Sequence, residues 1–273
     1  MPDFPICLCG ANKYRVHNYK TPGNDFSVII CGACSLARTW PQPIDLPSID
    51  DFYKSQTSHQ AKFDELPLRQ SFSHRPLEII KKYFSAGSLL DVGCSAGVFV
   101  AEAKKYGFDA RGIDLSESAI ELGRHNFGLG EALTVGSLKS LALPAGSFEV
   151  ITYLHCLEHI VDPIGELSEA KRVLSDQGIL VLELPRFFSL WRFLLGARWY
   201  GMSPTQHIWQ FGWRGAVFIL ERSGFEVIYA KKGLSMYHKI TADFSGLVKL
   251  LIYAFAWLSK TGDNLFIVAR KKK

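Results

Sequence analysis

Between residues 86 and 273, short apolar runs alternate with segments of helical periodicity. Seven of these runs have the length and composition of buried strands, and helical patterns such as "AGVFVAEAKKYG" and "DPIGELSEAKRVL" separate most of them. Repeated strand–helix alternation is typical of a mostly parallel sheet with helices on both faces. The strand-like runs are "SLLDVG", "DARGIDLS", "EALTVG", "FEVITYL", "GILVLELP", "FEVIYAKKG" and "NLFIVARK". The pattern therefore predicts an α/β, doubly wound, mostly parallel seven-stranded sheet.

Composition and charge limit the kinds of protein to which this chain can belong. The chain has 273 residues, of which 48% are hydrophobic, and a net charge of only +5. Such a balance favours a packed core and does not indicate a nucleic-acid partner. The N-terminus lacks a secretory pattern, and the longest apolar stretch, at 250–259, is too short to span a membrane. We expect a cytoplasmic protein of unspecified oligomeric state, whose apolar helix at 244–258 packs on the sheet or on another subunit. Weak peripheral membrane contact is the alternative.

Four cysteines crowd the first 34 residues, as Cys7-x-Cys9 and Cys31-x-x-Cys34. In a reducing compartment such a cluster is more often a metal site than a disulfide framework, and four thiolates suit structural zinc. The first pair is one residue short of the usual spacing, so His17 is a second candidate ligand. If no metal binds, the cysteines are small buried thiols. Residues 1–45 are therefore predicted to form a small zinc-ribbon-like module.

The Pro-rich connector "WPQPIDLPSIDDFY" leads into a segment at 46–85 that we expect to be a helical lead-in or lid. This segment ends in the helical pattern "PLEIIKKYF", where Pro76 is placed for the first turn. The third predicted domain is 86–273.

An acidic residue stands beside a glycine turn in "LLDVGCSAGVFVAEA". Asp91 precedes the loop from Gly93 to Gly97, and Asp114 ends the next strand. A dinucleotide-binding turn would have Gly-x-Gly-x-x-Gly spacing, and the carboxylate of Asp91 would repel a diphosphate. S-adenosylmethionine carries a sulfonium and an ammonium group, so a carboxylate suits it, and Asp114 is spaced to accept from ribose hydroxyls. The alternative is that both acids merely end strands in a fold that has lost its ligand.

Residues 86–273 resemble a class I S-adenosylmethionine-dependent methyltransferase of the small-molecule O-methyltransferase type, a Rossmann-like fold. The resemblance rests on "LLDVGCSAG", "GIDLS", "LPAGSFEVI", "LHCLEHIVDP", "EAKRVLSDQGILVLELP" and "LERSGFEV". Position 95 is Ser where many members have a third glycine, and position 137 is Ser where many have Asp. The resemblance implies contacts of the methionine moiety, ribose, adenine and sulfonium with Asp91, Gly93, Cys94, Gly97, Asp114, Leu115, Ser137, Leu138 and His155.

The segment "HCLEH" places His155, Glu158 and His159 at i, i+3 and i+4, on one face if the chain is helical there. One role is base catalysis, since methyl transfer to a hydroxyl requires loss of its proton; His159 is the first candidate for the base. A second role is a divalent metal site that includes His207, similar to the metal site of ubiquinone-pathway and small-RNA methyltransferases. A third is structural, with these side chains bracing the turn.

The insertion at 186–212 is rich in aromatic residues and arginine. It is predicted to cover the acceptor site, where Arg192, Arg198 and, just beyond, Arg214 could engage a planar or phosphorylated acceptor. A second small core is the alternative. The expected reaction is methyl transfer to a small-molecule hydroxyl. RNA or a glycan intermediate as the acceptor, or a non-catalytic binding protein, are the rival expectations.

Overall fold

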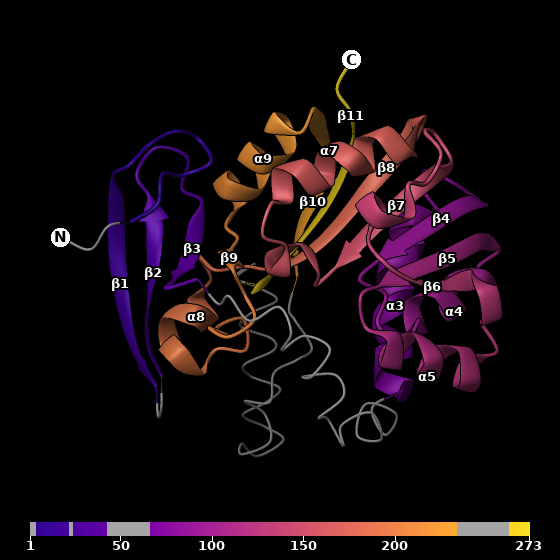
Figure 1. Cartoon of the computed structure of the whole chain (residues 1–273), viewed down its shortest axis with the longest axis horizontal. Coiled ribbons are helices and arrows are strands. Elements are labelled where there is room, and N and C mark those ends of the chain that lie inside the picture. The colour runs from indigo at the N-terminus through magenta and orange to yellow at the C-terminus, as the bar shows by residue number, and fades with distance from the viewer. Residues whose placement is uncertain (1–3, 22–23, 43–65, 234–261) are drawn as a thin grey trace.

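The computed structural model describes residues 4–21, 24–42, 66–233 and 262–273. Residues 46–65 of the predicted lead-in at 46–85 and the predicted apolar helix at 244–258 lie outside the described residues. Two sheets organise the rest: a large sheet in the middle and right of Figure 1, and a small one at its left. Among the described helices, none has the length and apolar character needed to cross a membrane.

The large sheet has seven strands in the order β10-β11-β8-β7-β4-β5-β6, and it confirms the predicted fold class. Only β11 runs antiparallel to its neighbours, β8 and β10. The strand order reverses between β4 and β7, which are adjacent and parallel. The strands are β4 (Gly87–Val92), β5 (Phe108–Asp114), β6 (Leu133–Val135), β7 (Phe148–Leu154), β8 (Leu174–Pro185), β10 (Phe225–Gly233) and β11 (Asn264–Lys271).

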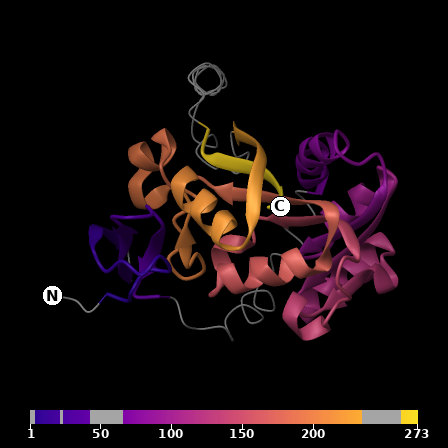
Figure 2. The same ribbon diagram turned by 90° about the horizontal axis from the view of Figure 1, so that it is seen from above.

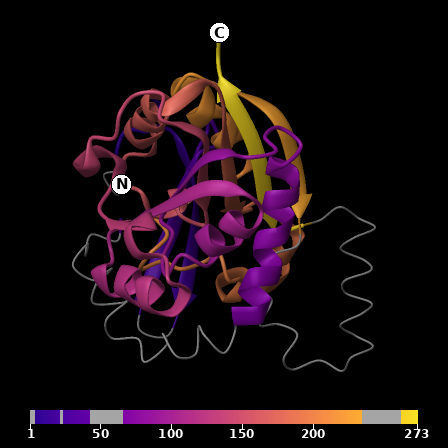
Figure 3. The same ribbon diagram turned by 90° about the vertical axis from the view of Figure 1, so that its right-hand side faces the viewer.

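Helices cover both faces of this sheet, as Figures 2 and 3 show. Alternate strand residues point to opposite faces, so each face has its own core. Leu90 and Ile151 belong to the core that contains residues of α7 and α9, whereas Leu89 and Val150 belong to the core under α3, α4 and α5. The helices are α3 (Leu66–Ile80), α4 (Val98–Lys105), α5 (Glu117–Phe127), α6 (Leu138–Leu141), α7 (Pro163–Val173), α8 (Leu190–Leu195) and α9 (Trp213–Arg222), with 3-10 turns η1 (Gly130–Ala132), η2 (Leu157–His159) and η3 (Gly196–Arg198).

Two helices begin at a residue whose side chain caps them, and a third begins earlier than its proline predicts. Ser116 caps α5 as predicted, its hydroxyl accepting from the amide of Ala119 at 3.2 Å. Asp162 caps α7 in the same way, with Pro163 in the first turn. The placement of Pro76 in a first turn is wrong: α3 begins at Leu66, and Pro76 lies inside it. Its ring is buried against the sheet side of the helix, where packing outweighs the lost amide.

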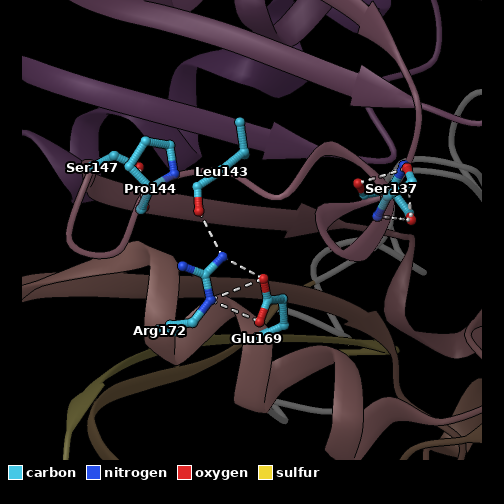
Figure 4. A network of polar contacts seen from close by, with 7 residues as sticks. Ser137, Leu143, Pro144, Ser147, Glu169 and Arg172 are labelled. Carbon is cyan, nitrogen blue, oxygen red and sulfur yellow. Dashed lines mark hydrogen bonds and ion pairs between the residues drawn. The ribbon is translucent and has the colours of Figure 1, made fainter.

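The loop between α6 and β7 is held by α7. Arg172 of α7 pairs with Glu169 and donates to the carbonyl of Leu143 at 2.6 Å, as Figure 4 shows. Ser147 donates to the carbonyl of Pro144 in the same loop. Ser137 is the N-cap of α6, the helix before this loop. The bonds of Arg172 and Ser147 therefore hold the chain between α6 and the start of β7.

The small sheet joins two segments that are far apart in sequence. It runs in the order β1 (Tyr14–Thr21), β2 (Asn24–Cys31), β3 (Ala37–Trp40) and β9 (Trp209–Gln210), with all neighbours antiparallel. Its core combines Phe26, Val28 and Ile30 of β2 with aromatic residues of the insertion, among them Trp199. The domain boundaries at residues 45 and 85 stay predictions, but β9 shows that the cysteine-bearing segment and the insertion build one sheet.

Candidate active site

The glycine loop follows β4 at the point where the strand order of the large sheet reverses. In open parallel sheets this switch point is where ligands bind, beyond the carboxyl ends of the strands. The amides of Gly93 and Cys94 both donate to the carbonyl of Ile113 on β5, at 2.8 and 3.1 Å. The loop is thereby attached to the neighbouring strand and then enters α4 at Gly97.

Two positions in this loop require glycine. Gly93 has φ 75° and Gly97 has φ 72°, a region that disfavours side chains. A Cβ at Gly93 would collide with the side chain of Cys156, and one at Gly97 would lie 2.7 Å from Leu129. The backbone at Gly93 is therefore packed directly on Cys156, which begins the "HCLEH" turn. Cys94 is buried on the other side of the loop, facing Gly112.

Asp91 lies inside the protein at the end of β4, only 3% exposed. The hydroxyl of Thr152, its register partner on β7, donates to Asp91 Oδ1 at 2.6 Å. Burial raises the pKa of Asp91 to about 7, the bond from Thr152 opposes that rise, and the charge of Asp114 adds to it. A cation beside Asp91 would favour the ionised form, so this carboxylate suits the positive end of S-adenosylmethionine.

Asp114 ties the glycine loop to the end of β5. Its carboxylate accepts from the amide of Ser95 at 2.8 Å and from the amide of Ser116 at 2.9 Å. Each carboxylate oxygen has a second lone pair, so these bonds leave acceptor capacity for ribose hydroxyls. The next residue, Leu115, is 60% exposed, an apolar side chain open to an adenine ring. Ser137 lies at the exposed start of α6, whereas Leu138 is fully buried beneath it.

The "HCLEH" segment forms a single 3-10 turn, η2, rather than an α-helix. His155 precedes the turn with φ 55°, so it does not share a helical face with His159. Its Nδ1 lies 3.7 Å from Glu158 Oε1. Within the described residues, Glu158, His159 and His207 offer ligand atoms that all lie within 4.8 Å of one another. The structure thus unites three of the four residues of the predicted divalent site, with His155 beside Glu158.

Both histidines of this cluster present an Nε2 lone pair. His159 Nδ1 lies 3.1 Å from the carbonyl of Gln206, and His207 Nδ1 lies 2.9 Å from the carbonyl of Gly201. A carbonyl only accepts, so each Nδ1 carries the proton and each Nε2 is free of one in the neutral ring. The carboxylate oxygens of Glu158 have no hydrogen-bond partner, although the residue is 1% exposed. Three Lewis-basic groups converge here, an arrangement suited to a proton or a cation.

Electrostatics keep Glu158 ionised and His207 neutral. Burial would raise the pKa of Glu158, but His155, His159 and His207 together lower it to about 2. Burial and the neighbouring His159 lower the pKa of His207 to about 4. Burial would also lower the pKa of His155, yet the carboxylate of Glu158, 3.7 Å away, and the charge of Glu183 raise it overall. A carboxylate that is ionised at neutral pH therefore lies among three imidazoles.

The four N-terminal thiols converge in the same manner. Cys7 Sγ lies 3.5 Å from Cys34 Sγ, Cys9 Sγ lies 3.5 Å from Cys31 Sγ, and all four lie within 4.8 Å of one another. A tetrahedral zinc with Zn–S bonds of about 2.3 Å needs sulfurs about 3.8 Å apart, so the cluster fits structural zinc. His17 is exposed on β1 and does not belong to this group.

The aromatic insertion packs on the small sheet. Phe187, Trp191, Trp199 and Met202 form a core with residues of β2, the alternative left open by the sequence. Arg192 is part of this packing: its guanidinium lies 4.3 Å from the ring of Phe187 and donates to Tyr19 Oη at 2.9 Å. Arg198 and Arg214 are exposed, so contact with an acceptor stays a prediction for them.

Sequence reasoning missed two residues that hold the site together. Thr152 bonds Asp91, and the backbone of Ser95 bonds Asp114. A polar residue in the buried middle of the strand "FEVITYL" was a signal for the first. The second is a backbone contact, which no side-chain pattern records.

The comparisons with known proteins agree with this geometry. Residues 64–230 match a family model described as a methyltransferase domain. A ubiquinone biosynthesis O-methyltransferase of Histophilus somni is 32% identical over 121 residues, covering 41% of this chain and 51% of that protein. Its counterpart in Nitrosococcus oceani is 34% identical over 136 residues, covering 43% and 57%. The chain thus spans about half the length of the curated relatives it matches.

Solved structures show the same fold. An S-adenosylmethionine-dependent methyltransferase from Archaeoglobus fulgidus aligns with a TM-score of 0.56 at 20% identity, covering 77% of this chain and 99% of that one. Another from Mesorhizobium loti aligns with a TM-score of 0.54 at 19% identity, covering 72% and 96%. The family model covers more than half of the chain, and the glycine loop and strand order agree with it. The chain belongs to the methyltransferase domain family, and its large sheet has the fold of the S-adenosylmethionine-dependent methyltransferases with which it aligns.

Proposed function

We propose that this protein transfers the methyl group of S-adenosylmethionine to a hydroxyl oxygen of a small molecule, with His159 as the general base. The observation that carries the proposal is the cluster of Glu158, His159 and His207. Two of these residues lie on the turn that follows Cys156, and Cys156 packs against Gly93 of the glycine loop. A proton acceptor and a methyl-donor loop therefore meet at one end of β7. The names of the relatives, which are O-methyltransferases, support oxygen as the methylated atom.

The cofactor supplies an electrophilic methyl group on a sulfonium. Asp91 would face its positive end, Asp114 would accept from the ribose hydroxyls, and Leu115 would pack on the adenine. Glycine at position 93 lets the loop pack on Cys156, where a Cβ would collide, and so holds the loop beside η2. These contacts would hold the cofactor at the end of the sheet where η2 lies, and holding two reactants in line is itself a large part of catalysis.

His159 would remove the proton of the acceptor hydroxyl. Its Nδ1 proton is directed to the carbonyl of Gln206, which leaves Nε2 to accept. The buried carboxylate of Glu158 would stabilise the imidazolium that results. His155, between Glu158 and the sulfonium end, would line the acceptor cleft.

A specific observation also favours a divalent cation at this cluster. The partnerless oxygens of Glu158 and the two opposed Nε2 atoms fit a carboxylate-and-imidazole site, and the backbone carbonyls that orient both rings are typical of metal ligands. Glu158, His159 and His207 would hold the ion, which would lower the pKa of the acceptor hydroxyl. In that case His159 acts as a ligand and not as the base.

We further propose that Cys7, Cys9, Cys31 and Cys34 bind a structural zinc. Four thiolates close the coordination shell, so this ion would take no part in the chemistry.

The test is incubation of the purified protein with a metabolite extract and S-adenosylmethionine labelled in its methyl group, followed by mass spectrometry. A labelled small molecule that loses its label under conditions that cleave methyl ethers supports the proposal. Label on nitrogen, carbon, RNA or glycan would contradict it. Calorimetry with the cofactor alone separates an enzyme from a non-catalytic binding protein that has lost the ligand, because the latter would give no heat.

A further inference from the structure

Strand β3 connects the four-cysteine module to the proposed catalytic cluster through one buried hydroxyl. Thr39 is fully buried, and its Oγ1 donates to the backbone carbonyl of His207 at 2.7 Å. Its own amide donates to the carbonyl of Ile208 at 2.9 Å. Gln210 donates to the same hydroxyl oxygen at 3.4 Å. Residues 168 positions apart in sequence are thus joined at the point where His207 enters the cluster.

The connection continues from His207 to the "HCLEH" turn. The amide of Ile208 donates to the carbonyl of Glu158 at 3.0 Å, so the His207–Ile208 peptide, whose carbonyl accepts from the Thr39 hydroxyl, is directly linked to η2. On the far side of the turn, the indole of Trp209 donates to the carbonyl of Ile160 at 2.8 Å. The turn that carries Glu158 and His159 is therefore hydrogen-bonded to the strand that Thr39 holds.

In the other direction, β3 begins at the cysteine cluster. The amide of Cys31 donates to the carbonyl of Leu36, and the amide of Ser35 donates to the carbonyl of Cys31, which closes the turn that carries Cys34. Leu36 is buried in the same core as Ile208. Ordering of the four thiols therefore orders the start of β3, and five residues after Cys34 the strand reaches Thr39.

We propose that Thr39 is a positioning residue through which the four-cysteine module sets His207 and Glu158 relative to His159. The inference rests on the proposed function, because the cluster matters only if it performs the chemistry. Reacting groups must be held within about half an ångström of their productive geometry. The imidazole of His207 is oriented by Gly201, but its backbone is oriented by Thr39, so loss of this hydroxyl would leave the two opposed rings free to separate.

The experiment compares Thr39→Val, which keeps the shape of the side chain but removes the hydroxyl, with Thr39→Ser, which keeps the hydroxyl. Ser27→Ala is the matched control, since its hydroxyl lies on the neighbouring strand β2 and donates to Asn18 Oδ1 and, among the described residues, to no atom of the cluster. Two quantities are measured: hydrogen exchange of the Ile208 amide by NMR, and the rate of S-adenosylhomocysteine formation in a fixed metabolite extract at saturating S-adenosylmethionine.

For Thr39→Val we expect exchange of the Ile208 amide at least about tenfold faster and a methyl-transfer rate about tenfold lower. Cofactor affinity by calorimetry should stay within about twofold, because β3 belongs to the small sheet and the glycine loop follows a strand of the large one. Thr39→Ser should restore both quantities, and Ser27→Ala should change neither. Unchanged Ile208 exchange in Thr39→Val, or a Thr39→Ser variant as impaired as Thr39→Val, would overturn the inference.

The exchange measurement separates this inference from the proposed function. If the native protein binds the cofactor but forms no S-adenosylhomocysteine, the proposed function fails, while the exchange of Ile208 still reports whether Thr39 holds the turn. If methyl transfer occurs and exchange is unaffected by the valine, the function stands and the positioning role is wrong.

Discussion

The imidazole rings of His159 and His207 lie edge to face, with their centroids 4.7 Å apart and an angle of 79° between their planes. The two residues are 48 positions apart in sequence, and each Nδ1 is directed to a carbonyl in the segment that connects Gly201 to His207. One ring is buried and the other half-buried, so a single short loop orients a pair of nitrogen bases beside the carboxylate of Glu158.

Replacement of His159 should remove catalysis and spare cofactor binding. General-base catalysis contributes about 10²–10⁴-fold, so we expect His159→Ala to lower the methyl-transfer rate by at least about 100-fold. The dissociation constant of S-adenosylmethionine, measured by calorimetry, should stay within a few-fold. His125→Ala is the matched control, because that histidine is exposed on α5. A His159→Ala variant with the native rate would show that another group removes the proton.

A bound cation would give a different pattern from a histidine base. If Glu158, His159 and His207 hold a divalent metal, then a chelator should abolish the rate and added Mg²⁺, Mn²⁺ or Zn²⁺ should restore it. His207→Ala would then be as inactive as His159→Ala, and metal analysis would show a second ion besides the zinc of the cysteines. A rate that is indifferent to chelation would leave His159 as the base.

Cofactor affinity should depend on pH through Asp91. Its pKa of about 7 in the free protein means that the proton must leave before the carboxylate can face a cation. By linkage, the affinity for S-adenosylmethionine should fall about tenfold between pH 8 and pH 6, with proton release that can be measured by calorimetry in two buffers. Asp91→Asn should bind more weakly at pH 8 and show no such dependence. Asp109→Asn, an exposed acid on β5, should keep it.

Asp91 should also make the stability of the cofactor-free protein depend on pH, but here the stability should fall as the pH rises. The pKa of Asp91 is raised on folding from its ordinary value of 3.8, so its contribution to the free energy of unfolding is greatest below pH 4 and declines as the pH rises toward 7. Asp91→Asn should remove that part of the pH dependence in urea titrations of the cofactor-free protein. An identical slope in both proteins would show that Asp91 titrates normally.

Asp114 should control affinity for the ribose. Hydrogen bonds to a charged group contribute about 1.5–3 kcal/mol, so Asp114→Ala should weaken cofactor binding by about 10- to 150-fold. The glycine loop should also loosen, since the amide of Ser95 loses its acceptor. Calorimetry measures the affinity, and Asp109→Ala on the same strand is the control. Unchanged affinity in Asp114→Ala would place the ribose elsewhere.

Zinc should be bound by the four N-terminal cysteines and by no other thiol. We expect one zinc per chain by elemental analysis, lost in Cys34→Ser and kept in Cys94→Ser. Loss of a structural metal should cost at least about 3 kcal/mol, which corresponds to roughly 6–12 °C in the melting temperature for a domain of this size. A metal-free native protein with a normal melting temperature would mean that the cysteines are merely buried thiols.

Local patterns in the sequence sufficed for the large sheet. Each of its seven strands is an apolar run whose ends carry turn residues, and Ser116 and Asp162 cap helices by chemistry within three residues of the cap. The glycine loop and the positions of Asp91 and Asp114 at strand ends were predictable for the same reason, although their bonds to Thr152 and to the amide of Ser95 were not. Pro76 was misplaced because buried packing can keep a proline inside a helix against its local preference.

The sequence by itself determined the fold class, the glycine loop and the residues proposed for the site, because those features depend on periodicity and short spacings. Only the tertiary structure decided that β3 pairs with β9, that Thr39 bonds His207, and that His207 faces His159 rather than the surrounding aromatic residues. These contacts join segments more than 40 residues apart, and no local pattern encodes which of several buried polar groups will meet. A buried polar group generally needs a hydrogen-bond partner, and the packing of the whole chain decides which group becomes that partner.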